Sequence, residues 1–212
     1  FKLLKMKNSV TFLLFLVCLY SCSSGKTKKK SNFNKDQIAL ILKDVDDTPM
    51  RVYKITNKTD SILLRAQSTY VKPDSTDVVL QRFVNRLYET VRDSMSLGVG
   101  IAAPKVGILK NIIWVQRFDK ENLPFEVYLN PKIIDYSTEK QTYREGCLSI
   151  PNRTETLDSR SKTIVIEYDT MKEEHKTDTI SDFTAVIFQH EIDHLNGILY
   201  LDHLNQEVKD AE

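Results

Sequence analysis

The sequence predicts an α+β fold, in which short antiparallel or mixed strands surround a central helix and another helix lies nearer the N-terminus. Two observations support this prediction. Apolar residues recur at helical spacing in residues 77–96 and again in residues 183–196. Between these segments lie short runs rich in β-branched residues, without the regular alternation of strand and helix that is typical of parallel sheets. A length of 212 residues favours a single domain with appendages.

The first predicted helix runs from Asp77 to Ser96, and Asp77 is its expected N-cap. A glycine-rich segment at residues 98–107 follows and leads into a predicted strand at Asn111 to Phe118. A nucleotide-binding glycine loop would instead follow a strand and open a helix. The order of these elements therefore argues against a dinucleotide site.

Two further strands are predicted, at Glu126 to Asn130 and at Thr163 to Tyr168, because apolar and polar residues alternate there. Asn130-Pro131 and Ile150-Pro151-Asn152 are signals for a turn or a break between these strands. These short segments are expected to form the sheet of the domain.

The second predicted helix, Phe183 to Asn196, ends at Gly197 and carries the most informative motif of the chain. His190 and His194 lie four residues apart on one face of this helix, with Glu191 between them. This spacing is typical of a site for a divalent metal ion with an adjacent general base. Because a catalytic site of this kind uses three protein ligands and an open position, a third ligand must come from elsewhere.

Three kinds of residue are candidates for the third metal ligand. In a zincin a third histidine would stand where this sequence has Tyr200, and His203 comes three residues later. A downstream carboxylate would have to come from Glu207 or Glu212, in a short polar tail that leaves little chain for another ligand helix. Cys147 offers a thiolate, which is a strong ligand for a borderline-soft cation.

Three separated motifs give the chain a resemblance to a known family. They are Gly98 to Pro104, Glu145 to Ser149 and Gln189 to His194, and they resemble the three motifs of peptide deformylase, in the same order. The resemblance extends from about Met50 to Leu204. It implies an enzyme that removes the formyl group from N-formylmethionyl peptides. It also implies one divalent metal ion, Fe²⁺ or Zn²⁺ with Ni²⁺ or Co²⁺ as further options, held by Cys147, His190 and His194.

The same resemblance implies roles for other residues. Glu191 would be the general acid and base, and the backbone N–H of Leu148 would stabilise the oxyanion. The backbone at Val99 and Gly100 would pair with the peptide as an added strand. Ile187 would line the pocket for methionine, or it would serve only in core packing.

An ion pair between Glu145 and Arg160 is expected to support the strand that carries Cys147, unless both are simple surface charges. Lys105 is a departure from the family, whose glycine motif ends in a glutamine that helps to bind the oxyanion. Three outcomes are open: Lys105 acts as the oxyanion donor, it turns to solvent and activity falls, or the protein binds without turnover.

Residues 1–22 are expected to be a signal peptide of the lipoprotein type, with a lipid on Cys22. Lys5 and Lys7 precede an apolar run from Val10 to Tyr20, which is shorter than the ~20 residues that a spanning helix needs. An uncleaved apolar tail is the alternative. We expect a flexible tether at 23–49, a deformylase-like catalytic domain at 50–204 and a polar tail at 205–212, in an exported protein anchored to the membrane by its lipid.

The 30 basic and 29 acidic side chains nearly cancel, so charge gives no argument for a nucleic-acid partner. We expect a monomer that acts on a peptide. Two other functions stay open from the residues alone: a zinc-dependent metallopeptidase that uses the same histidines, and a noncatalytic lipoprotein that binds metal or formyl peptides.

Overall fold

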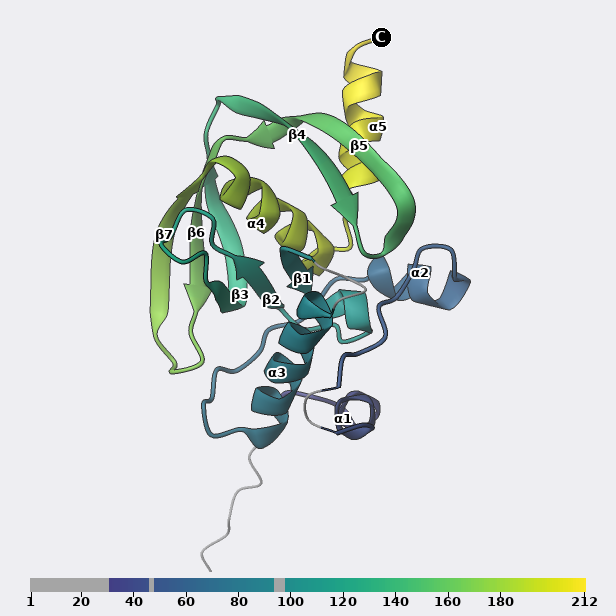
Figure 1. Cartoon of the computed structure of the whole chain (residues 1–212), viewed down its shortest axis with the longest axis vertical. Helices are drawn as coiled ribbons and strands as arrows, with labels where there is room; N and C mark the ends of the chain where they lie inside the picture. Colours follow the sequence, from purple (N-terminus) through teal and green to yellow (C-terminus); the bar gives the residue numbers. More distant parts are fainter. Residues whose placement is uncertain (1–30, 46–47, 94–97) are drawn as a thin grey trace, which may run out of the picture. The chain divides into compact units, whose positions relative to one another are not determined.

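The computed structural model describes residues 31–45, 48–93 and 98–212. The expected signal peptide, Cys22, the start of the tether and the last residues of the helix predicted to end at Ser96 lie outside the described residues. The α+β class is confirmed, and the strands pair in antiparallel fashion (Figure 1).

The described chain contains five α-helices and seven strands. The helices are α1 (Lys35–Leu42), α2 (Lys58–Leu64), α3 (Val78–Arg92), α4 (Asp182–Leu195) and α5 (Tyr200–Asp210), with a 3₁₀ turn, η1 (Ala103–Val106). The strands are β1 (Gly100–Ala102), β2 (Ile112–Gln116), β3 (Phe125–Tyr136), β4 (Lys140–Cys147), β5 (Ile150–Ser161), β6 (Thr163–Asp169) and β7 (His175–Ser181). One sheet has the order β1-β2-β3-β6-β7, and β4 and β5 form a separate two-stranded sheet.

Helix α4 lies between the two sheets and contacts strands of both (Figure 1). Its side chains from Thr184 to Ile192 are all buried, together with His194 and Leu195. A helix that is buried on nearly every side has to place its polar residues against specific partners, because an unpaired buried polar group is costly. This position explains why the polar side chains of α4 are candidates for function.

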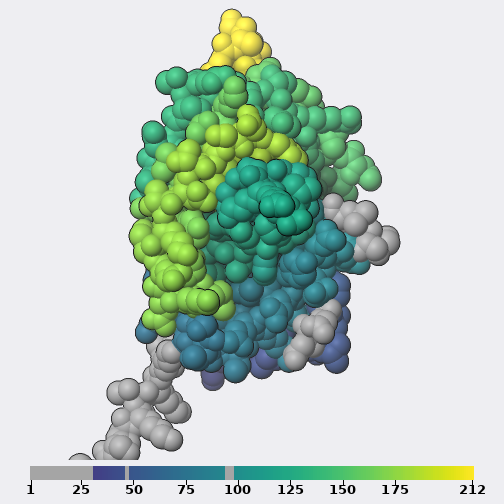
Figure 2. Space-filling view, turned by 60° about the vertical axis from the view of Figure 1, so that its left-hand side comes forward, coloured from purple at the N-terminus to yellow at the C-terminus, as the bar shows by residue number. Residues whose placement is uncertain are grey.

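Helix α3 has the predicted N-cap, because the Asp77 side chain accepts hydrogen bonds from the backbone N–H groups of Val79 and Leu80. Its buried apolar face includes Leu80, Phe83 and Leu87 and packs in one core cluster with strands β1 and β2. The other core cluster lies between the larger sheet and α4. At the surface, the β2–β3 turn lies against the start of α4 (Figure 2), where the rings of Phe118 and Phe183 are 5.0 Å apart.

Two predicted breaks are wrong. Strand β3 continues through Pro131, because a register shift between Leu129 and Lys132 takes the proline out of the regular ladder. Asn130 adopts a φ of 51° at this point, and its side chain bonds to the backbone of Val71. Strand β5 likewise runs through Pro151, since a proline is tolerated near the start of a strand.

The structure differs from the expected flexible tether over residues 32–45. Helix α1 begins with a reciprocal capping box between Asn34 and Gln37. Phe33 and Ile41 are buried in the same core cluster as α3, and the Phe33 ring meets the Phe83 ring edge to face at 5.7 Å. The folded unit accordingly begins near Ser31 and not near Met50.

The expected polar tail is mostly helical, because α5 extends to Asp210. The Glu207 carboxylate accepts hydrogen bonds from the backbone N–H groups of Asp158 and Ser159 on β5. This helix therefore packs on the two-stranded sheet. Within the described residues, no helix is long and apolar enough to cross a membrane.

We predict that Phe33→Ala lowers the free energy of unfolding by about 3 kcal/mol, the usual cost of removing a buried aromatic ring. Val45→Ala is the matched control, because this side chain is 76% exposed and its change should stay within about 0.5 kcal/mol. Urea denaturation measures both. Equal midpoints for the two variants would contradict the docking of residues 31–45.

Candidate metal centre

Cys147, His190 and His194 come together in one cluster, with one ligand atom of each lying within 4.8 Å of the others. Among the described residues, this is the group of three that could hold a metal ion. The Sγ atom of Cys147 lies 3.2 Å from Nε2 of His194, and the backbone N–H of Ser149 points to the same sulfur at 3.4 Å. The cluster joins the last residue of β4, Cys147, to two histidines that lie one turn apart on α4.

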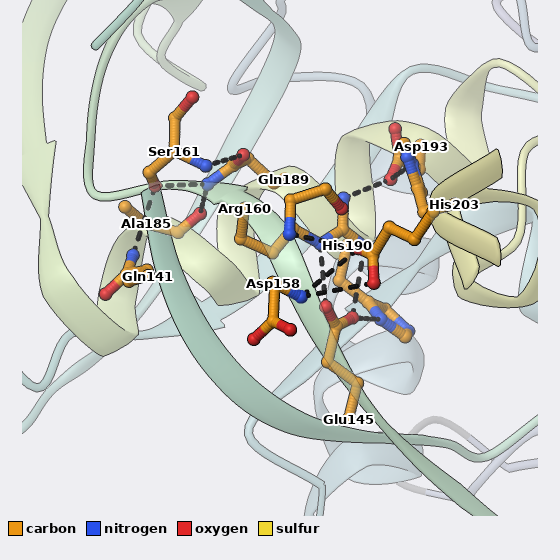
Figure 3. A network of polar contacts seen from close by, with 12 residues as sticks. Gln141, Glu145, Asp158, Arg160, Ser161, Ala185, Gln189, His190, Asp193 and His203 are labelled. Carbon is orange, nitrogen blue, oxygen red and sulfur yellow. Dashed lines mark hydrogen bonds and ion pairs between the residues drawn. The ribbon is translucent and has the colours of Figure 1, made fainter. Parts of the chain in front are cut away.

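The expected pair of Glu145 and Arg160 is present and also positions a metal ligand (Figure 3). Arg160 donates two hydrogen bonds to the carboxylate, at 2.7 and 3.1 Å, and Nδ1 of His190 lies 2.8 Å from the same carboxylate. Burial alone would raise the pKa of Glu145, but the hydrogen bonds from His190 and Arg160 outweigh it and lower the pKa to about 2. An ionised Glu145 fixes the ring of His190 so that Nε2 faces the cluster.

Arg160 extends this network to a second acidic residue. Its guanidinium lies 2.6 Å from the carboxylate of Asp193, and Nε2 of His203 lies 2.8 Å from the same carboxylate (Figure 3). His203 on α5 therefore takes part in a polar network beside the cluster and is not one of its three members.

Gln189, the first residue of the third motif, has a structural role that the sequence did not assign. Its amide bonds to both backbone groups of Ser161 on β5, at 3.0 and 2.9 Å, and to the carbonyl of Ala185 (Figure 3). These bonds hold α4 against β5 one residue before His190. Its place in the motif was the only sequence signal for this residue, because a buried amide has no periodic signature.

Glu191 forms a buried ion pair with Lys105. The Lys105 ammonium lies 2.8 Å from Oε1 of Glu191, and the two side chains are 2% and 4% exposed. Burial would lower the pKa of Lys105, but the charges of Glu191 and Cys147 raise it, so the ammonium stays charged. The other carboxylate oxygen, Oε2, is buried and has no hydrogen-bond partner among the described residues.

The protonation of the three cluster residues fits a site for a soft or borderline divalent cation. Burial would raise the pKa of the Cys147 thiol, but the Lys105 ammonium and His190 lower it, which favours the thiolate. Hydrogen bonds with Cys147 and Glu145 outweigh burial and raise the pKa of His190 to about 9. Burial and then Lys105 lower the pKa of His194. A cation bound to the thiolate would replace the proton on His190, since metal ligands bind deprotonated.

A cavity of about 570 Å³ opens beside the cluster. Its walls include all four residues expected near the substrate, namely Val99, Gly100, Leu148 and Ile187, together with Glu191. Ile187 also belongs to the core between α4 and the larger sheet, so its two expected roles coexist. Glu191 lines the cavity, whereas Lys105 is not among the described residues that line it.

Gly100 lets β1 approach the helix that carries the cluster. A Cβ atom at this position would lie 2.8 Å from Cγ2 of Ile187 and 2.9 Å from Oε1 of Glu191. Contacts this short are not seen for real Cβ atoms, so any other residue at this position would force the Ile187 or Glu191 side chain to move. The glycine therefore serves the packing of β1 on α4, beyond the room for a peptide that the sequence suggested.

Comparison with known proteins identifies the family. The family model described as polypeptide deformylase matches residues 52–210. A peptide deformylase of Finegoldia magna is 34% identical over 164 residues, which cover 77% of this chain and 96% of that protein. A peptide deformylase of Borreliella burgdorferi is 38% identical over 147 residues, covering 69% of this chain and 85% of that protein.

Solved structures agree with these relatives. A class I type b peptide deformylase from Acinetobacter baumannii superimposes with a TM-score of 0.66 at 30% identity, over 74% of this chain and 99% of that chain. The peptide deformylase of Thermotoga maritima gives a TM-score of 0.63 at 30% identity, over 73% of this chain and 97% of that chain. The motifs, the fold and these matches agree, and the chain belongs to the polypeptide deformylase family.

Proposed function

We propose that the protein removes the formyl group from N-formylmethionyl peptides and releases formate. The observation that carries this proposal is the cluster of Cys147, His190 and His194 beside a cavity that is lined by Cys147, His190 and Glu191. The size of the cavity suits a short peptide. A similar peptide deformylase from Acinetobacter baumannii was crystallised with Met-Ala-Ser bound, which supports a peptide ligand.

One divalent ion, Fe²⁺ or Zn²⁺ with Ni²⁺ or Co²⁺ as further options, would be held by Cys147, His190 and His194. When bound, such an ion supplies Lewis acidity, which polarises a carbonyl and makes water more acidic. The Oε2 atom of Glu191, which has no partner among the described residues, is proposed to accept the proton of the attacking water. Glu191 then passes this proton to the departing amine, which leaves a free amino terminus.

Other residues of the cavity would hold the peptide. The backbone N–H of Leu148 is proposed to donate to the developing oxyanion, and the backbone at Val99 and Gly100 to pair with the peptide as an added strand. Ile187, which is buried at the cavity wall, is proposed to contact the methionine side chain. Each of these roles requires only residues that line the cavity.

Lys105 is proposed to act through Glu191 and not as a direct oxyanion donor. Glu191 lines the cavity, whereas Lys105 is not among the described lining residues. Lys105 is 1% exposed and its ammonium pairs with Glu191 at 2.8 Å. This pairing argues against the outcome in which the side chain turns to solvent. The ion pair holds Oε1 of Glu191 and leaves Oε2 as the carboxylate oxygen without a hydrogen-bond partner among the described residues.

The geometry does not favour a metallopeptidase that uses His203 as its third ligand. The imidazole of His203 bonds to Asp193, and the cluster is completed by Cys147. A noncatalytic binding protein would have the same three metal ligands. An assay of formate release distinguishes it from an enzyme.

We also propose that the protein is exported and anchored by a lipid on Cys22. Support comes only from the sequence, in which Lys5 and Lys7 precede the apolar run that ends at Tyr20, two residues before the cysteine. An extracytoplasmic enzyme would act on formylated peptide fragments and not on nascent chains.

We predict that Cys147→Ser loses the bound metal and the release of formate from a formylmethionyl tripeptide. His203→Ala should keep the metal, because His203 is not a ligand in this account. Elemental analysis of the purified variants, run beside the formate assay, measures both effects. Metal loss in His203→Ala with retention in Cys147→Ser would favour the metallopeptidase, and full metal without formate would favour a binding protein.

Replacing Lys105 with methionine is expected to lower kcat at least about tenfold, because the general base loses its positioning partner. KM should change little, since Lys105 does not line the cavity. Lys105→Gln, which keeps a hydrogen-bond donor, should fall between this variant and the parent. Lys132→Met is the control, because Lys132 has a 71% exposed side chain. A rise in KM with constant kcat would contradict the role assigned to Lys105, provided that melting curves show folded protein.

Growth with labelled palmitate tests the anchor. The full chain should take up label and partition with membranes, whereas Cys22→Ser should do neither because it lacks the acylated thiol. A soluble, unlabelled product from the unaltered chain would rule out the lipid anchor.

A further inference from the structure

The cavity beside the metal cluster carries three basic side chains on its walls. Lys54 comes from the segment before α2, whereas Arg144 and Arg153 come from β4 and β5. None of the three belongs to the motifs that define the family resemblance. Their common position around one cavity arises only when these distant segments fold together.

Two of these cations have no acidic partner among the described residues. The Lys54 ammonium donates to the carbonyl oxygen of Leu148, and Arg144 donates to the hydroxyl of Thr154 at 2.7 and 3.0 Å. Only Arg153 forms an ion pair there, with Glu155 at 2.7 Å. Arg144 and Lys54 therefore keep charge that a ligand in the cavity can meet.

The two carboxylates that line the same cavity do not offset this charge, because buried cations neutralise both of them. Glu145 is paired with Arg160 and His190, and Glu191 is paired with Lys105. Where β4 and β5 line the cavity away from the Cys147 thiolate, a ligand consequently meets a positive wall, even though the whole chain is close to neutral.

The position of Arg144 indicates which part of a peptide it would meet. Residues 144 to 148 all line the cavity, so its wall follows β4 away from Cys147. A strand advances about 3.3 Å per residue, which places Arg144 about 10 Å along β4 from the cysteine. An extended peptide advances at the same rate. A peptide that follows β4 from the cluster would therefore have its third residue beside Arg144 when its formyl group is at the cluster.

We infer that Lys54, Arg144 and Arg153 form a basic wall that selects formylated peptides with a carboxylate at the third residue. The carboxylate is either an acidic side chain or the free C-terminus of a tripeptide, and the chemistry of recognition is the same. This inference rests on the proposed deformylase function and adds the substrate class to it.

Four peptides test the inference: formyl-Met-Ala-Asp amide, formyl-Met-Ala-Ser amide, formyl-Met-Ala-Lys amide, and formyl-Met-Ala-Ser with a free carboxylate. The kcat/KM for formate release should be roughly tenfold higher for the aspartate than for the lysine peptide at low salt. The difference should shrink near 1 M NaCl, where the Debye length falls to about 3 Å. A higher kcat/KM for formyl-Met-Ala-Ser with a free carboxylate than for its amide would show that the C-terminal carboxylate is also recognised.

Arg144→Glu should reverse the order of the aspartate and lysine peptides. Thr154→Val removes the hydroxyl that Arg144 contacts but keeps the charge, so it should preserve the order. Lys172→Glu makes the same charge change at an exposed site on the β6–β7 turn and should also preserve it. An identical order in Arg144→Glu and the parent would overturn the inference.

Binding of the same peptides to the zinc-loaded Glu191→Gln variant separates this inference from the proposed function. Calorimetry should show the same preference for the carboxylate without any turnover. If no formate is released by the parent but the binding order holds, the proposed function fails and the basic wall stands. If formate is released and neither kcat/KM nor affinity depends on the charge of the third residue, the basic wall fails and the function stands.

Discussion

The carboxylate of Glu145 is the group on which the geometry of the site depends. It joins Arg160 on β5 to His190 on α4, and it lies two residues before Cys147 on β4. Glu145, Arg160 and His190 are all buried, and without Glu145 the His190 ring would lose the carboxylate that orients it, while Arg160 would keep only Asp193 as an acidic partner among the described residues. The same interaction thus fixes the orientation of one metal ligand and the distance between the two elements that carry all three.

Other contacts reinforce this connection between the small sheet and α4. Gln189 bonds to the backbone of Ser161, Arg160 reaches on to Asp193, and Gly100 allows β1 to lie against Ile187 and Glu191. The result is a buried helix in which, among the described residues, the buried polar side-chain atoms left without a hydrogen-bond partner are Oε2 of Glu191 and Nδ1 of His194. The two carboxylate oxygens of Glu191 differ, because Oε1 is held by Lys105 and Oε2 has no partner among the described residues.

The metal ligands could be predicted from the sequence for two different reasons. His190 and His194 are one helical turn apart, and this local spacing is visible in a single sequence. Cys147 is separated from His194 by 47 residues, so its place in the cluster followed from the resemblance and not from spacing. The cap at Asp77 and the stop at Gly197 were also local signals, and in the structure Gly197 has a φ of 73°.

The features that the sequence did not predict depend on tertiary contacts. Helix α1 has only eight residues, and a helix this short is stable only when it packs, as it does here against α3. Strand β3 passes Pro131 because of a bulge that depends on its partner β6. Two further features join segments that are distant in the chain, namely the ion pair of Lys105 with Glu191 and the basic wall of the cavity. No local sequence pattern predicts either of them.

X-ray absorption at the metal edge of the purified protein tests most directly the claim that one cysteine and two histidines hold the cation. For zinc, this account predicts a first shell with one sulfur at about 2.3 Å and two imidazole nitrogens at about 2.0–2.1 Å, and Cys147→Ser should remove the sulfur. A shell of nitrogen and oxygen without sulfur in the unaltered protein would contradict it.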